Sequence, residues 1–280
     1  MVSVCVILYD NEKFIEPFFQ SLLKGINEDW EIILFDNNSN DRTVSLLETL
    51  IKNTKYSANI KLIKSKTNLG YAAGVNRCVG AAQYDDILLV NPNSITERKH
   101  LQSLLTFYQS HRTAIVAGRY VEYLHNGPKA QPSAVHSASF TACMLQLTNI
   151  GKILPFLTFA NTFWEKQTGK ELEVTGVSAG FTFFSKKLFS KVEGFDEGFF
   201  MYLEDLDFCM RARERGHSVY FYPRAQLQHF GGGSSMNEKN RHRKQHWRDS
   251  RNRFFKKHFS PWQYFFFKIT DTLESRAGLI

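Results

Sequence analysis

Short apolar runs alternate with longer amphipathic stretches over roughly the first 120 residues of the chain. The apolar runs predict strands at Val4–Tyr9, Glu31–Phe35, Ile60–Ile63, Ile87–Val90 and Ala114–Ala117. The stretches between them have helical spacing and predict helices at Glu12–Lys24, Thr43–Ile51, Ala72–Gln83 and Leu101–Tyr108. Strands that alternate with helices form βαβ units, so we expect an α/β fold whose mostly parallel central sheet is flanked by helices.

Polar clusters follow three of the predicted strands, at Asp10-Asn11, Asp36–Asp41 and Asn91–Ser94. The carboxyl ends of parallel strands meet at one edge of a sheet, and this edge is where such sheets bind their ligands. We therefore expect the three clusters to gather around a ligand site.

The alternation is lost between His125 and Leu172, where glycine and proline interrupt apolar patches. A long excursion of this kind in a compact domain is usually functional or mobile. The pattern then returns and predicts a strand over Val174–Phe184, a helix over Glu204–Arg215 and a strand over Ser218–Tyr222.

Length and composition fit one large globular domain with a well-buried core. The chain has 280 residues, of which 43% are hydrophobic and 22% charged, and these values exclude disorder. The four cysteines lie far apart without a C-x-x-C pair, which argues against a zinc knuckle or a disulfide scaffold and favours a reducing compartment. No signal peptide or run of ~20 apolar residues is present, so we expect a cytoplasmic protein, soluble or peripheral on the inner face of the membrane.

The positive charge is concentrated near the C-terminus. Of the formal net charge of +8, Glu238–His258 contributes nine Lys/Arg residues and two acids, or +7, which leaves +1 for the rest of the chain. Aromatic residues follow this basic segment at Phe259, Trp262, Tyr264, Phe265, Phe266 and Phe267. Basic residues beside aromatic ones suit an anionic bilayer surface. They suit equally well a solvated helix whose aromatics pack on the core or form a homodimer.

Two other classes of protein are disfavoured. A nucleic-acid binder would explain the basic aromatic segment but not the acidic and amide-rich edge of the sheet, so we expect no nucleic-acid partner. A dinucleotide-dependent oxidoreductase would carry a G-x-G-x-x-G turn after the first strand, and this sequence has none there.

Candidate functional residues at the sheet edge each have a structural alternative. Asp36 ends the second strand and suits a ribose contact or a helix cap. The glycine-spaced loop Asn68–Asn76 allows close approach of a phosphate or sugar, or forms a tight turn. The Asn91-Pro92-Asn93 turn suits a diphosphate, a metal ion or a plain chain reversal.

Two acids, Glu204 and Asp205, open a predicted helix directly after the aromatic stretch Phe199–Tyr202. Acids at a helix N-terminus are stabilised by the macrodipole, which gives them a capping role. Aromatic neighbours also reduce solvation and raise the pKa of a carboxylate, as a general base requires. Further along, His229 precedes a glycine run and suits a metal ligand, a phosphate contact or a hydrogen-bonded surface residue.

In their order along the chain, these segments resemble family 2 glycosyltransferases of the GT-A fold, and within them the rhamnosyltransferase group. The likeness covers about 200 residues, and only the combination of segments is specific. The matching stretches are Val2–Asp10, Glu31–Asp41, Asn68–Gly80, Leu88–Ser94, Val174–Phe184, Gly194–Glu197, Phe199–Arg213 and His229–Ser235. The resemblance implies a catalytic domain over residues 1–237, with a nucleotide-sugar-binding half (1–121) and an acceptor and catalytic half (122–237), followed by a helical basic and aromatic extension (238–280).

The resemblance also implies roles for individual residues. Asp205 matches the catalytic base, with Glu204 as its neighbour, and His229 matches the histidine that completes the metal site of the family. The residues implied to bind the nucleotide sugar are Tyr9, Asp10, Asp36, Asn68, Gly70, Asn76, Asn91 and Asn93.

The sequence departs from the family at the position of the metal-binding acid. The family has D-x-D, or Asn-Pro-Asp in the rhamnosyltransferase group, where this chain has Asn91-Pro92-Asn93. Because Mg²⁺ and Mn²⁺ prefer charged oxygen ligands, the amide of Asn93 should weaken metal binding. Three alternatives follow: a metal held by Asn93, Asp36, His229 and the diphosphate, a basic residue in place of the metal, or lost activity.

The implied reaction is an inverting sugar transfer, with dTDP-L-rhamnose as the donor suggested by the resemblance. Asp205 would take the proton of an acceptor hydroxyl while the nucleoside diphosphate leaves from the opposite face of the sugar. A glycan or polyprenyl-linked glycan in cell-surface polysaccharide biosynthesis would be the acceptor. The competing hypothesis is a catalytically weak pseudo-glycosyltransferase that binds a nucleotide sugar or supports a partner enzyme.

Overall fold

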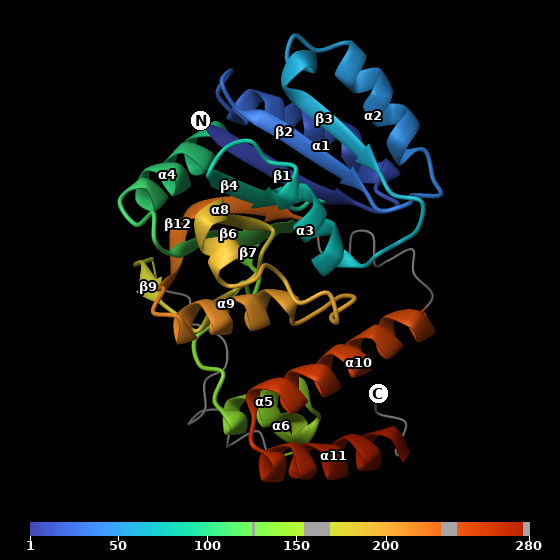
Figure 1. Cartoon of the computed structure of the whole chain (residues 1–280), viewed down its shortest axis with the longest axis vertical. Coiled ribbons are helices and arrows are strands. Elements are labelled where there is room, and N and C mark those ends of the chain that lie inside the picture. Colours follow the sequence, from blue (N-terminus) through green and yellow to red (C-terminus); the bar gives the residue numbers. More distant parts are fainter. Residues whose placement is uncertain (125–126, 154–168, 231–239, 277–280) are drawn as a thin grey trace.

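One large sheet forms the centre of the molecule (Figure 1). The computed structural model describes residues 1–124, 127–153, 169–230 and 240–276. The main strands lie in the order β3 (Ile60–Lys64), β2 (Glu31–Asp36), β1 (Val2–Leu8), β4 (Asp86–Val90), β11 (Phe181–Ser185), β6 (Ile115–Leu124), β12 (Val219–His229) and β5 (Ser94–Ile95). Two short strands extend the sheet, β7 (Gly127–Ala130) beside β6 and β9 (Leu172–Glu173) beside β12.

The strands β3, β2, β1 and β4 pair in parallel, as the alternating pattern predicts. The strands β1, β2 and β4 are buried along their whole length, which is typical of a parallel sheet covered on both faces. The sheet changes direction at β11, which runs antiparallel between β4 and β6, whereas β12 is again parallel to β6. The expected α/β fold with a mostly parallel sheet is therefore confirmed.

Helices cover both faces of the sheet (Figure 1). The residues of β1 alternate between two cores, so that Val4 and Val6 belong to one and Cys5 and Ile7 to the other. The first core contains residues of α1 (Glu12–Gly25), α2 (Thr43–Lys52) and α4 (Arg98–Gln109). The second contains residues of α3 (Tyr71–Gly80), α8 (Lys186–Lys191) and α9 (Glu204–Glu214). A short 3₁₀ helix, Ser57–Asn59, leads into β3.

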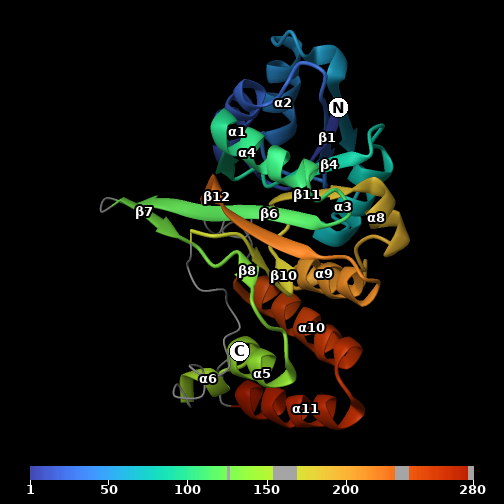
Figure 2. The same cartoon turned by 90° about the vertical axis from the view of Figure 1, so that its left-hand side faces the viewer.

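A third layer of helices lies beyond α9, on the side away from the sheet (Figures 1 and 2). It consists of α5 (Phe140–Leu147), α6 (Ile150–Ile153), α10 (Asn240–His258) and α11 (Pro261–Arg276). This layer has its own core, in which Phe254, Phe255 and Phe267 are fully buried. A small sheet of β8 (Ala134–Val135) and β10 (Gly176–Val177) leads toward it.

Ion pairs attach α10 to the rest of the molecule. Asp196 accepts from Arg253 at 2.6 Å and from Lys257 at 2.7 Å. Burial alone would raise the pKa of Asp196, but these two cations and the amide of Gly198 hold it well below its ordinary value. Asp207, on α9, accepts from His258 at 2.8 Å. Part of the basic segment thus holds the C-terminal helices in place.

The structure corrects three of the expected elements. The single strand expected over Val174–Phe184 is two, β10 and β11, because the chain turns at Gly180 around Asn91 and leaves no room for a side chain there. The strand expected to end at Tyr222 continues to His229, past an irregularity in its pairing after Tyr222. The helix α5 lies in the excursion after His125. It is mostly apolar and buried and has no clear polar face, so no amphipathic pattern marked it as a helix in the sequence.

Some of the expectations lie outside the described residues. These include the boundary between residues 237 and 238, part of the excursion, and the matching stretch after Phe230. Among the helices that the structure describes, none is long and apolar enough to cross a bilayer.

Candidate active site

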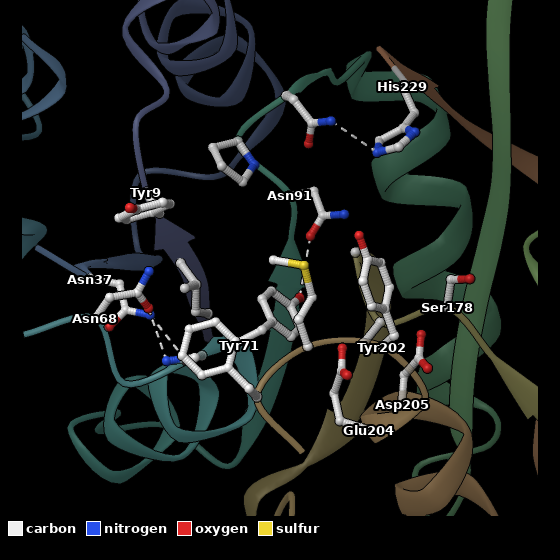
Figure 3. Close-up of a pocket in the computed structure, with 18 of the residues that line it drawn as sticks. Tyr9, Asn37, Asn68, Tyr71, Asn91, Ser178, Tyr202, Glu204, Asp205 and His229 are labelled. Carbon is white, nitrogen blue, oxygen red and sulfur yellow. Dashed lines mark hydrogen bonds between the residues drawn. The ribbon is translucent and has the colours of Figure 1, made fainter. Parts of the chain in front are cut away.

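A cavity of about 300 Å³ lies where β1 and β4 end, facing the start of α9 (Figure 3). It brings together eight of the residues expected at the site: Tyr9, Asn68, Gly70, Asn91, Asn93, Glu204, Asp205 and His229. The edge of the sheet where the polar clusters were expected to gather is therefore the wall of this cavity.

The loop before α3 forms one side of the cavity and is held by two asparagines. Asn37 accepts from the amide of Leu69 at 2.8 Å and donates to the carbonyl of Gly70 at 3.0 Å. Asn68 accepts from the amide of Gly70 at 3.0 Å. Gly70 has φ of +84°, a left-handed conformation that favours glycine. These contacts fix a turn whose backbone lies against the cavity.

The residues at the back of the cavity pack closely against one another, and at Gly180 there is no room for a larger side chain. Tyr71 donates through its hydroxyl to Asn91 at 3.2 Å, and Gly180 donates its amide to the hydroxyl of Tyr120 at 2.6 Å. A Cβ atom on Gly180 would lie 2.2 Å from the side chain of Asn91. Glycine at this position therefore allows β11 to pass directly behind the Asn91 turn.

The start of α9 presents Glu204 and Asp205 side by side to the cavity (Figure 3). The two preceding residues, Tyr202 and Leu203, have φ of +76° and +66°, which is uncommon for residues other than glycine. Backbone of this kind persists where surrounding contacts fix it, and it is concentrated at functional sites. Here it reverses the chain so that the helix begins at the cavity.

The two carboxyl groups differ in how readily they lose a proton. Burial raises the pKa of Asp205 to about 6, although the amides of Leu206 and Ala179 favour its charged form. Burial, followed by repulsion from Asp205, raises the pKa of Glu204 well above its ordinary value. Glu204 Oε2 is buried and has no hydrogen-bond partner in the described part of the chain. Glu204 is therefore the carboxyl group that is harder to ionise, and Asp205 is the one that loses its proton more readily.

The third acid of this helix, Asp207, does not take part in the site. It is fully buried and bonds to Arg211 at 2.8 Å, Lys257 at 2.7 Å and His258 at 2.8 Å. Burial raises its pKa, but these partners outweigh burial and the net shift is downward. Asp207 thus joins α9 to α10. Its role is structural and differs from the roles of Glu204 and Asp205.

Asn93 and His229 meet at the far end of the cavity, but they bond to each other. His229 Nδ1 lies 2.8 Å from the side-chain oxygen Oε1 of Gln131, so Nδ1 carries the proton and Nε2 accepts from Asn93 Nδ2 at 3.2 Å. Asn93 also donates to the carbonyl of Phe230 at 2.7 Å. Burial lowers the pKa of His229 to about 4, so the ring is neutral.

This arrangement does not fit a Mg²⁺ or Mn²⁺ site. The lone pair on Nε2 of His229, through which the ring could bind a metal, already accepts from Asn93. Asn93 itself offers a neutral amide oxygen, whereas these cations prefer a carboxylate. In the ranges that the structure describes, no cluster of three or more His, Cys, Asp or Glu side chains is placed to hold a metal. The polar groups expected to bind a metal instead form a neutral hydrogen-bonded chain.

The substitution Asn93→Asp should create a cation site, because it removes the donor that engages His229 and supplies a carboxylate beside the freed lone pair. We expect its affinity for Mn²⁺, measured by titration calorimetry with nucleoside diphosphate present, to exceed that of the wild type about tenfold or more. Asn91→Asp is the control, since it adds the same charge two residues away. Equal Mn²⁺ affinity in the wild type and Asn93→Asp would contradict this assignment.

Three of the expected nucleotide-binding residues do not line the cavity. Asp10 accepts from the amide of Asn40 at 2.7 Å, and Asp36 accepts from the amide of Ser39 at 3.3 Å. Both therefore shape the loop behind Tyr9 and Asn37. Asn76 donates to the carbonyl of Phe195 and accepts from its amide, each at 2.9 Å, so its polar groups hold the turn before α9.

Several residues that line the cavity were not expected from the sequence, among them Tyr71, Tyr120, Ser178 and Tyr202. Tyr120 stacks on His229, with ring centroids 4.8 Å apart. Its strand was expected to end at Ala117, and a longer reading of that apolar run would have placed Tyr120 at the edge of the sheet. Tyr202 ends the aromatic stretch that precedes Glu204, whereas Ser178 carries no comparable local signal.

Solved structures with this architecture define the fold as GT-A, the fold of nucleotide-sugar-dependent glycosyltransferases. GalNAc-T7, with UDP, GalNAc and Mn²⁺, superposes with a TM-score of 0.64 at 14% identity over 82% of this chain and 43% of that one. The mannosyltransferase PcManGT from Pyrobaculum calidifontis, with GDP-Man and Mn²⁺, gives 0.60 at 13% identity over 94% and 66%. S. aureus TarS 1-349 gives 0.55 at 16% identity over 92% and 72%.

The chain belongs to glycosyltransferase family 2, whose family model matches residues 3–192. A second model, described as the N-terminal domain of galactosyltransferase, matches residues 162–233.

The curated relatives include rhamnosyltransferases. The N-acetylglucosaminyl-diphospho-decaprenol L-rhamnosyltransferase of Mycobacterium tuberculosis is 22% identical over 82% of this chain and 76% of that protein. Rhamnosyltransferase WbbL of Escherichia coli K12 is 24% identical over 82% and 83%. The match to EpsE of Bacillus subtilis reaches 32% identity but spans only 42% of this chain and 41% of EpsE.

Proposed function

We propose that the protein transfers a sugar from a nucleotide sugar to a hydroxyl group of a glycan or lipid-linked glycan, with inversion at the anomeric carbon. The observation that carries the proposal is Asp205, a carboxylate with a pKa of about 6 at the wall of the cavity. A base with this pKa is ionised at neutral pH and still accepts a proton readily. Burial and repulsion from Asp205 raise the pKa of the neighbouring Glu204 well above its ordinary value, so Asp205 is the more readily ionised acid of the pair.

The proposed reaction is one displacement. The acceptor oxygen forms a bond to the anomeric carbon as the bond from that carbon to the diphosphate breaks, and the hydroxyl proton passes to Asp205. The electron pair of the broken bond leaves with the nucleoside diphosphate. The loop of Asn68 and Gly70 lies on the opposite side of the cavity from α9, which suits a donor held there with its leaving group turned away from the base.

The donor that we propose is dTDP-L-rhamnose, since relatives named as rhamnosyltransferases align over most of the chain. In thermal denaturation, a bound donor at about 100 times its Kd should add about 2.7 kcal/mol to the free energy of unfolding. For a chain of this size, that corresponds to an increase in Tm of roughly 5 °C. We expect this increase with dTDP-rhamnose but not with UDP-GlcNAc or GDP-mannose at equal concentration; a larger increase with either of the latter would reassign the donor.

A polyprenyl-linked glycan on the cytoplasmic face of the membrane is the acceptor that we propose. The name of the mycobacterial relative specifies a diphospho-decaprenol acceptor for that protein, and this supports the same chemical class here. Transfer at this location would serve cell-surface polysaccharide biosynthesis.

One observation favours a second candidate function, a nucleotide-sugar-binding protein with weak activity. Where a metal-binding acid is expected in this family, the chain has Asn93, which forms a hydrogen bond with His229. Donor hydrolysis measured with dTDP-rhamnose separates the two functions, because a binding protein would raise its Tm with the donor and release no dTDP.

A further inference from the structure

The last helix, α11, has two apolar faces, and only one of them packs on the protein. On the inner face, Phe267 is fully buried and packs on Phe255, with ring centroids 4.1 Å apart. The outer face carries large apolar side chains with high exposure: Trp262 75%, Phe265 54%, Phe266 58%, Ile269 44% and Leu273 59%. We call these five residues the outer stripe. Their spacing of three and four residues aligns them along one side of the helix.

The outer stripe lies on the outside of the third layer. In both views α11 lies at the end of the molecule farthest from the sheet, and α10 lies between it and α9 (Figures 1 and 2). The short helix α6 is a neighbour of α11, since the amide of Asn149 donates to Glu274. Ile153 at the end of α6 is 70% exposed. Both α11 and its neighbour α6 therefore expose large apolar side chains.

The charges around the outer stripe are arranged asymmetrically. Both acids of α11, Asp271 and Glu274, are on the inner face, where they are buried and paired with Arg251. The remaining charged side chains of α11 are cations: Arg276 is exposed, and Lys268 is partly exposed although it pairs with Asp271 at 3.5 Å. Lys152, on α6, is also exposed. An apolar face bordered by cations, with its acids turned inward, is complementary to an anionic surface.

We propose that the outer stripe lies in the headgroup region of an anionic lipid bilayer, with α11 parallel to the membrane plane. Tryptophan and phenylalanine are the side chains that favour this interface, and a helix of this kind is buried by its apolar face alone. The proposal does not depend on which sugar the cavity transfers.

A lipid surface fits the outer stripe better than a second copy of the chain. The stripe exposes roughly 600 Å², counting about 200 Å² for a full aromatic side chain, whereas a stable protein interface buries about 800 Å² on each partner. A symmetric dimer through α11 would also bring the cations of both copies together. Anionic headgroups neutralise these cations and need no shape complementarity.

The test is co-sedimentation with vesicles of phosphatidylcholine, with and without phosphatidylglycerol. We expect the wild type to bind the anionic vesicles, and the double variant Phe265→Ser/Phe266→Ser to lower its partition coefficient about tenfold or more through the lost apolar burial. Both side chains are exposed, so the fold should tolerate the changes. Tyr123→Ser is the matched control, because Tyr123 is a 50% exposed aromatic residue on β6; its partition should equal that of the wild type.

Three results would overturn the proposal. The wild type could fail to bind anionic vesicles, or the double variant could bind them as well as the wild type does. The wild type could also be a dimer that dissociates in the double variant, which would assign the outer stripe to a second copy. The Tm increase produced by the donor, measured on the same samples, reports on donor binding separately from membrane binding.

Discussion

Replacement of Asp205 by asparagine is expected to lower kcat for sugar transfer by about 10²–10⁴, the usual contribution of a general base. Asparagine has nearly the same shape and can still accept from the amide of Leu206, which lies 2.8 Å from the carboxylate. It cannot take the proton of the acceptor hydroxyl. The donor should therefore bind with unchanged Kd, and the loss should appear in kcat.

The pH dependence of the wild type tests the same base. Because the pKa of Asp205 is about 6, kcat/KM should fall tenfold per unit as pH decreases below 6 and should level off above it. The residual activity of Asp205→Asn should lack this decrease. Measurements with a soluble acceptor and saturating donor, in buffers of constant ionic strength, separate this effect from changes in substrate binding.

The free energy of unfolding provides an independent readout. The folded-state pKa of Asp205 lies above its unfolded value of about 3.9, so ionisation costs stability at pH above 6 and costs nothing below about 4. The variant should therefore be more stable than the wild type at pH 8, by at most about 3 kcal/mol, and the difference should vanish near pH 4.

Glu204→Gln is the companion variant. Glutamine has nearly the shape of glutamic acid and cannot ionise, and burial already disfavours the charged form of Glu204, so the loss of kcat should be much smaller than that of Asp205→Asn. If Glu204→Gln abolishes transfer while Asp205→Asn retains it, the two roles are reversed. Near-normal turnover in Asp205→Asn would remove the proposed base altogether.

The substitution Gly70→Ala is expected to abolish donor binding and to lower Tm. A Cβ atom at this position would lie 2.5 Å from the carbonyl oxygen of Phe200, a backbone atom that cannot rotate away. The left-handed backbone of Gly70 adds about 1–2 kcal/mol of strain for any residue with a side chain. The same carbonyl accepts from the amide of Tyr71 at 2.7 Å, so a displacement would break the contact between the loop and the start of α9.

Gly80→Ala is the matched control, because Gly80 lies at the other end of α3 and has open space where its Cβ would be. It should leave donor binding unchanged and alter stability by no more than the helix preference for alanine, about 1 kcal/mol. The decrease in Tm and the weakening of Kd by more than tenfold should be confined to Gly70→Ala, since only there does the clash reach the cavity. Normal donor affinity in that variant would show that the loop is not part of the donor site.

The first half of the fold was predictable because its signals are local. The strands around Val4, Ile33 and Leu88 are apolar runs between amphipathic helices, and these patterns require a sheet covered on both faces. The position of Glu204 and Asp205 was predictable for a similar reason, because two acids after an aromatic stretch begin a helix.

The back of the cavity was not predictable, since it depends on contacts between distant segments. Tyr120 and Gly180 are 60 residues apart and meet only when β6 and β11 pair. Asn93 and His229 lie together, but the direction of their hydrogen bond is set by Gln131, in the excursion. Sequence spacing carries no information on such a partner.

The basic segment shows the same limit for charges. The basic segment was expected to face either a membrane or solvent, yet Arg253 and Lys257 bind Asp196, and Lys257 also binds Asp207. Net charge along a sequence does not reveal which cations are paired within the fold. The surface that is available to lipid is instead the stripe on α11, where neighbouring aromatics alternate between buried and exposed faces.

The segment directly before α9 is held from both ends of the polypeptide. The carbonyl of Phe200 accepts from the amide of Tyr71, and the carbonyl of Met201 accepts from Ser250 at 2.7 Å. The position of Asp205 therefore depends on contacts from an early and a late part of the chain. A chain that ends before Ser250 would lack one of these two contacts, so the segment before α9 would be held from one side only.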